Sequence, residues 1–110
     1  MKPPSKAPIY MMMYQGLCVI ARKHGYALAV HGSMNCDLDV VAIPWVDKPS
    51  TAKELALALN SHVIMCGYCH KKGLDAEERA TRKPHGRKAW KFHYKEDLSL
   101  DISVMPTKEK

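Results

Sequence analysis

The alternation of hydrophobic and polar positions along the chain predicts two helices. Between residues 8 and 24, apolar side chains recur every three or four positions, as in a helix that buries one stripe. This stripe consists of Tyr10, Met13, Leu17, Ile20 and Ala21. A second helix is expected from residue 51 to about residue 65, because a Thr followed three residues later by a Glu fits a capping box. Residues 1–7 and 106–110 are predicted to be flexible ends.

A period of two residues predicts four strands. Residues 26–31 and 37–45 form the first two, joined by a turn at 32–36, and residues 88–94 and 98–105 form the last two. Apolar residues fall on both faces of the strand at 37–45, so we expect a central strand with both faces at least partly covered and helices packed on it. Residues 67–86 form a long connection, within which residues 75–82 could form a short helix.

These elements define an α+β fold with the order α-β-β-α-β-β. We expect a small mixed sheet of about four strands with two main helices on one face, in a single domain of 110 residues. The formal net charge of +6 suits anionic partners such as nucleotides or nucleic acid. The sequence shows no secretion signal and no apolar run long enough to span a bilayer, so we expect a cytoplasmic protein without a membrane partner.

The candidate chemistry lies in two aspartates, Asp37 and Asp39, that follow the pair Gly32-Ser33. Alternate side chains of a strand project to the same side, with their Cα atoms roughly 6.6 Å apart. Two carboxylates on one face repel each other unless a cation lies between them, and Mg²⁺ or Mn²⁺ suits such oxygen ligands. Asp101, in the last strand, has the same setting. We expect these three acids to form one site, although solvated aspartates at the start of a strand are the alternative.

This arrangement resembles the DNA polymerase β-like nucleotidyltransferase superfamily in its smallest, stand-alone form. A short strand runs into Gly32-Ser33, Asp37-Leu38-Asp39 leads the next strand, and a later strand carries Asp101. The resemblance covers residues 26–45 and 88–105. The chain also looks like small nucleotidyltransferase-like phage proteins, which share the segment from Lys83 to Trp90.

The resemblance implies metal-dependent transfer of a nucleotidyl group from a nucleoside triphosphate to an unknown acceptor, such as RNA or a protein. Asp37, Asp39 and Asp101 would be catalytic and would hold two Mg²⁺ (or Mn²⁺) ions. Gly32 and Ser33 would contact the phosphates. The turn between Ser33 and Asp37 is shorter than is usual in the family. An inactive module of the same fold, which binds nucleotide, nucleic acid or a protein partner, is therefore the alternative.

The second half of the chain is rich in basic residues that could bind phosphate groups. Lys83, His85 and Arg87 are the preferred substrate-binding candidates, because they lead into the strand that we expect beside Asp101.

The run from Cys66 to His70 matches the haem-attachment pattern C-x-x-C-H. We expect no haem, because that chemistry belongs to an oxidising compartment and no export signal is recognisable. Zinc bound by Cys66, Cys69 and two more ligands, such as His70, His85 or His93, stays open, since the two cysteines have the spacing of a zinc site.

Overall fold

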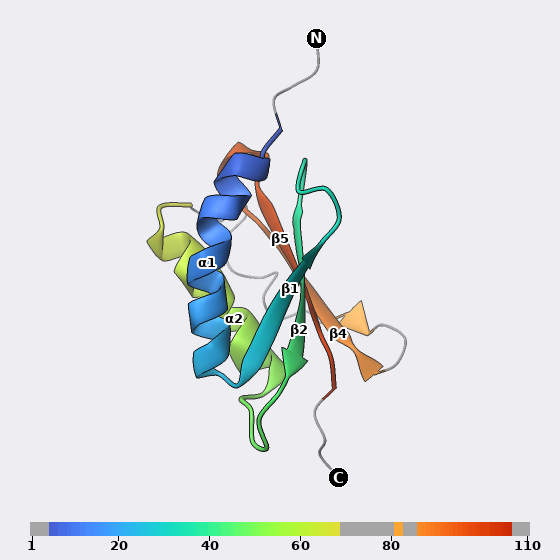
Figure 1. The fold of residues 1–110 in the computed structure, drawn as a ribbon. Helices are drawn as coiled ribbons and strands as arrows, with labels where there is room; N and C mark the ends of the chain where they lie inside the picture. The colour runs from blue at the N-terminus through green and yellow to red at the C-terminus, as the bar shows by residue number, and fades with distance from the viewer. Residues whose placement is uncertain (1–4, 69–80, 83–85, 107–110) are drawn as a thin grey trace.

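A computed structural model describes residues 5–68, 81–82 and 86–106 (Figure 1). The elements in chain order are α1 (Ala7–Lys23), β1 (Tyr26–His31), β2 (Leu38–Pro44), α2 (Ala52–Met65), β3 (Thr81–Arg82), β4 (Lys88–His93), the short 3-10 helix η3 (Lys95–Asp97) and β5 (Ser99–Val104). The strands form one sheet in the order β1-β2-β5-β4-β3. The pair β2–β5 is parallel and the other pairs are antiparallel. The predicted α+β class, the mixed sheet of four main strands and the two helices are confirmed.

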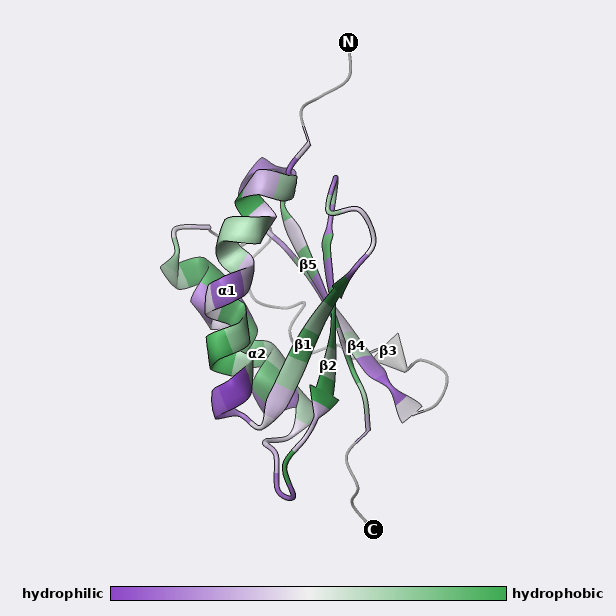
Figure 2. Cartoon of the chain, viewed as in Figure 1, coloured by the Kyte–Doolittle hydropathy of each residue, from purple (hydrophilic) through white to green (hydrophobic). Residues whose placement is uncertain are grey.

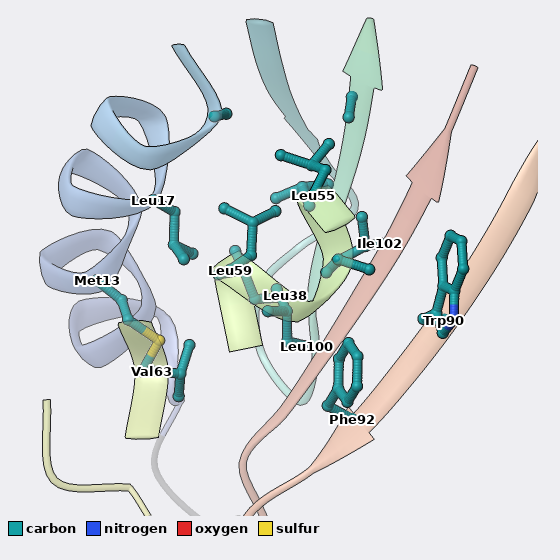
Figure 3. Packing of buried hydrophobic residues seen from close by; sticks show 14 of the residues in the cluster. Met13, Leu17, Leu38, Leu55, Leu59, Val63, Trp90, Phe92, Leu100 and Ile102 are labelled. Atoms are coloured by element: carbon teal, nitrogen blue, oxygen red, sulfur yellow. The ribbon is translucent and has the colours of Figure 1, made fainter. Parts of the chain in front are cut away.

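The two helices lie side by side against the same face of the sheet (Figure 1). Alternate residues of β2 and β5 point toward them and are buried: Leu38, Val40 and Ala42 from β2, and Leu100, Ile102 and Val104 from β5. Leu17 of α1 and Leu55 and Leu59 of α2 face these residues across the core (Figure 3). Each fully buried large apolar side chain contributes about 1.5–3 kcal/mol, so this layer is the main source of stability.

The start of α2 is closed by the predicted capping box. The Thr51 hydroxyl oxygen accepts a hydrogen bond from the Glu54 backbone N–H at 3.1 Å, and the Glu54 carboxylate accepts one from the Thr51 N–H at 2.9 Å. The helices themselves meet at Gly16, where a Cβ atom would collide with the His62 ring. A glycine at this position therefore allows α1 and α2 to approach closely.

The structure bears on two expectations about the sheet. Within the described part of the chain, helices cover one face of β2, and Ile43 on the other face is 46% exposed. Val41 on that face is half-buried, so the second face of β2 is only partly covered, and both helices pack on the first. Thr81 and Arg82, expected in a short helix, pair with β4 as a strand. The rest of that expected helix lies outside the described residues.

Hydropathy follows the same division. Hydrophobic residues run along α2 and β2, whereas β4 carries hydrophilic residues (Figure 2). On β4, Trp90 and Phe92 are buried, while Lys91 and His93 between and after them are exposed. The sheet therefore has one apolar face under the helices and one face that carries most of the polar strand residues.

Candidate functional site

Asp39 and Asp101 lie directly opposite each other on neighbouring strands. They are register partners in the parallel pair β2–β5, and such partners are about 4.8 Å apart between backbones. Residues on either side of each aspartate are buried under the helices, so the two carboxylates project from the other, polar face. Both aspartates are half-buried. The register thus brings together two residues that are 62 positions apart in the chain.

Asp37 joins them from the residue before β2. Its Oδ1 atom accepts a hydrogen bond from the Ser99 hydroxyl at 2.7 Å, and its Oδ2 atom lies 3.3 Å from the Lys91 Nζ atom. The hydrogen bond from Ser99, followed by the contact with Lys91, lowers the pKa of Asp37 below its ordinary value. All three predicted aspartates therefore lie on one face and at one end of the β2–β5 pair.

The electrostatic environment of Asp39 is different. Burial, and next the negative charge of Asp101, raise the pKa of Asp39, and the charge of Asp37 adds to this effect. His31, the register partner of Asp39 on β1, acts in the opposite direction. Lys91 acts in the same direction as His31, but burial, the largest cause, and the two neighbouring carboxylates outweigh both basic residues, so the pKa of Asp39 is raised.

Tyr10 of α1 anchors the strands beneath this site. Its hydroxyl donates a hydrogen bond to the Cys36 carbonyl at 2.8 Å and accepts one from the Ser99 N–H at 2.9 Å. Cys36 precedes Asp37, and Ser99 donates to that aspartate, so one buried phenol fixes the backbone on both sides of the contact. The hydrophobic pattern marked Tyr10 as a core residue and did not indicate this second role.

The turn before β2 brings Gly32 close to the Asp39 carboxylate. Gly32 has a φ of +81°, and a Cβ atom added there would lie 3.1 Å from Asp39 Oδ2. The neighbouring Ser33 hydroxyl oxygen accepts a hydrogen bond from the Asn35 N–H at 3.1 Å. The backbone of Gly32 is therefore adjacent to the Asp39 carboxylate, while the Ser33 side chain takes part in the turn itself. The structure thus places Gly32 beside Asp39, and the role of Ser33 toward phosphate stays a prediction.

Of the basic substrate-binding candidates, the structure describes Arg87. Its Nη1 atom donates a hydrogen bond to the Ser103 hydroxyl at 3.2 Å. Ser103 is two residues beyond Asp101 and so projects from the same face. Lys83 and His85 lie outside the described residues, and their assignment stays a prediction.

The aspartates agree with a hard divalent cation in donor type, because Mg²⁺ and Mn²⁺ prefer carboxylate oxygens. Within residues 5–68, 81–82 and 86–106, however, no three His, Cys, Asp or Glu side chains are grouped so that they could hold a metal ion. Asp37 is turned toward Ser99 and Lys91. A cation held by all three acids would therefore have to displace Lys91 from Asp37 or share that carboxylate with it.

Cys66 lies at the end of α2, with its Sγ atom 3.6 Å from the His62 Nε2 atom. His62 was not among the predicted ligands, although it lies four residues before Cys66, and side chains at this spacing are neighbours on a helix. Cys69 and His70 lie outside the described residues, so the zinc site stays a prediction.

The sequence pattern did not indicate a role at the site for Tyr10, Ser99 or Lys91. Lys91 is one of many basic residues in the second half of the chain. Ser99 carries a recognisable signal, since it is two residues before Asp101 and shares its face. The position of Lys91 beside the aspartates could be found only from the register of β4 against β5.

No helix in the described part of the chain has the length and apolar character to cross a membrane. Comparisons with known protein families, curated proteins and solved structures found no match to this chain.

Proposed function

We propose that this chain is a metal-dependent nucleotidyltransferase that uses a nucleoside triphosphate and acts on an acceptor not yet identified. The register of Asp39 with Asp101 carries this proposal, together with Asp37 on the same face. Nucleotidyl transfer forms a bond between an acceptor oxygen and the α-phosphorus and breaks the bond to pyrophosphate. It depends on positioning and on neutralisation of phosphate charge, which a cluster of carboxylates can organise.

The three aspartates would hold two Mg²⁺ or Mn²⁺ ions, which would neutralise the phosphates and the attacking oxygen. The backbone N–H groups at Gly32 and Ser33 would bind phosphate oxygens beside Asp39. Arg87 would bind an anionic part of the substrate from the polar face, since its guanidinium lies near Ser103.

The second candidate is an inactive module of the same fold that binds nucleotide, nucleic acid or a protein partner. The contact of Asp37 with Lys91 favours it, because an ammonium group already neutralises that carboxylate. The absence of a grouped metal-ligand set within the described residues favours it as well. This candidate predicts binding that does not require a divalent cation.

Metal-dependent thermal stabilisation separates the two candidates. With an enzyme site, Mg²⁺ or Mn²⁺ together with a nucleoside triphosphate raises Tm, and the double variant Asp37→Asn/Asp39→Asn loses this increase. Asp47→Asn, in the exposed loop after β2, is the matched control and keeps it. If no triphosphate changes Tm with either metal, the enzyme proposal is wrong.

Turnover is tested by incubating the protein with α-³²P-labelled triphosphates and a cell extract. Transfer of label to RNA or protein identifies the class of acceptor, and the double aspartate variant should abolish it. Nucleotide binding without metal, with no transfer of label, would instead support the inactive module.

A further inference from the structure

The ammonium group of Lys91 reaches the aspartates from a third strand. Lys91 lies on β4 as the register partner of Asp101, and its Nζ atom is 3.3 Å from Asp37 Oδ2. His31, Asp39, Asp101 and Lys91 consequently form one row across β1, β2, β5 and β4. In this row the two aspartates lie between a histidine and a lysine.

Both oxygen atoms of Asp37 have partners. Ser99 donates to Oδ1, and Lys91 contacts Oδ2. A divalent cation that binds Asp37 must displace Lys91 from Oδ2 or share the carboxylate with it. If they share it, the cation and the ammonium group lie close together and repel each other. Lys91 and the cation are therefore alternatives at the same carboxylate.

We propose that Lys91 is a built-in counter-ion that competes with the divalent cation for Asp37. The ammonium group neutralises the carboxylate in the metal-free protein and is displaced when a cation binds. Lys91 thereby sets the metal concentration at which the site fills. This inference rests on the proposed function, because it concerns the same aspartates, but it makes a separate prediction about affinity.

The test is the affinity for Mn²⁺, measured by titration with detection of free Mn²⁺ by electron paramagnetic resonance. Lys91→Gln should bind Mn²⁺ about two- to fivefold more tightly than the unchanged protein, the range that corresponds to loss of an exposed ion pair. Lys91→Arg retains the positive charge and should bind with nearly the original affinity. Competition by Mg²⁺ should follow the same order.

Lys88→Gln is the matched control for net charge. Lys88 is exposed on the same strand, three residues from Lys91 and so on the opposite face. Its removal should leave Mn²⁺ affinity unchanged. In an Asp37→Asn background the ion pair is absent, so Lys91→Gln should have little effect on the Mn²⁺ affinity that remains.

Unchanged or weaker Mn²⁺ binding by Lys91→Gln, with circular dichroism showing a folded protein, would overturn this inference. Metal binding by the unchanged protein would still support the proposed function in that case. If the unchanged protein binds no Mn²⁺ with or without a triphosphate, the proposed function fails as well. An equal increase in Mn²⁺ affinity for Lys88→Gln would also overturn this inference, because net charge, and not the contact with Asp37, would then set the affinity.

Discussion

The hydroxyl of Tyr10 accepts a hydrogen bond from the backbone N–H of Ser99 at 2.9 Å, across 89 positions of the chain. The same hydroxyl donates to the Cys36 carbonyl. One side chain of α1 thus joins the beginnings of β2 and β5, the strands that carry the candidate aspartates. Burial raises the pKa of Tyr10, and its protonated hydroxyl can donate one of these hydrogen bonds and accept the other.

Replacing Tyr10 with Phe should lower the free energy of unfolding by about 1–3 kcal/mol, because it removes the hydrogen-bond partner of a buried N–H group. Urea unfolding monitored by circular dichroism measures this loss. Tyr14→Phe is the control, since the Tyr14 hydroxyl donates to the Leu28 carbonyl of β1. A larger loss from the Tyr14 variant would contradict the anchoring role of Tyr10.

The elements of this fold are predictable because burial repeats with the period of each element. The stripe on α1 and the alternation in β2 require contact with the core on one side, and each pattern is local in the sequence. How far the second face of β2 is covered was not predictable in the same way. It depends on where both helices pack, which the pattern within one strand does not specify.

The candidate site could be predicted in its residue types but not in its contacts. Asp37, Asp39 and Asp101 stand out by spacing and by their apolar neighbours. Their relation to Ser99 and Lys91 depends on the register of β5 with β2 and β4, which side-chain periodicity does not determine between distant strands.

Neutralising Asp37 and neutralising Asp39 should have opposite effects on the metal-free protein. Asp37→Asn weakens the contacts with Ser99 and Lys91 and should lower the free energy of unfolding, by no more than about 1 kcal/mol because the pair is exposed. Asp39→Asn removes a carboxylate that its neighbours repel and should raise Tm. Calorimetry in EDTA measures both effects, and changes of the same sign would contradict the charge distribution described above.

The pH dependence of the same variants gives a second measurement. The pKa of Asp37 is lowered on folding, so its stabilising contribution is present above its ordinary pKa and is lost as the pH falls through the folded value. The pKa of Asp39 is raised on folding, so its destabilising contribution is present above the folded value and is relieved as the pH falls through it. On acidification, the gain in stability caused by Asp39→Asn should therefore disappear first, at a higher pH. The loss of stability caused by Asp37→Asn should disappear only at a lower pH. Urea unfolding at a series of pH values tests this order.

The capping box at Thr51 should contribute to global stability without affecting the candidate site. Thr51→Ala removes the acceptor for the Glu54 N–H and should cost about 1 kcal/mol. Thr51→Ser keeps a hydroxyl group and should retain most of this stability. Urea unfolding measures the cost, while the Tm increase caused by metal and triphosphate should persist in both variants. Loss of that increase in Thr51→Ala would show that the start of α2 is coupled to the aspartates.

Replacing Gly32 with Ala should affect both stability and the candidate site. The φ of +81° is strained for alanine, and the added Cβ would lie 3.1 Å from Asp39 Oδ2, so we expect a loss of about 1–2 kcal/mol. Gly67→Ala is a matched control, because Gly67 has a φ of +106° with no atom within 4 Å of such a Cβ. Both variants carry backbone strain, but the Gly32 variant also crowds the Asp39 carboxylate.

Thermal unfolding with and without Mn²⁺ and a triphosphate should show reduced ligand stabilisation for Gly32→Ala and full stabilisation for Gly67→Ala. Equal ligand effects in the two variants would mean that Gly32 serves the turn alone and that its approach to Asp39 does not affect binding.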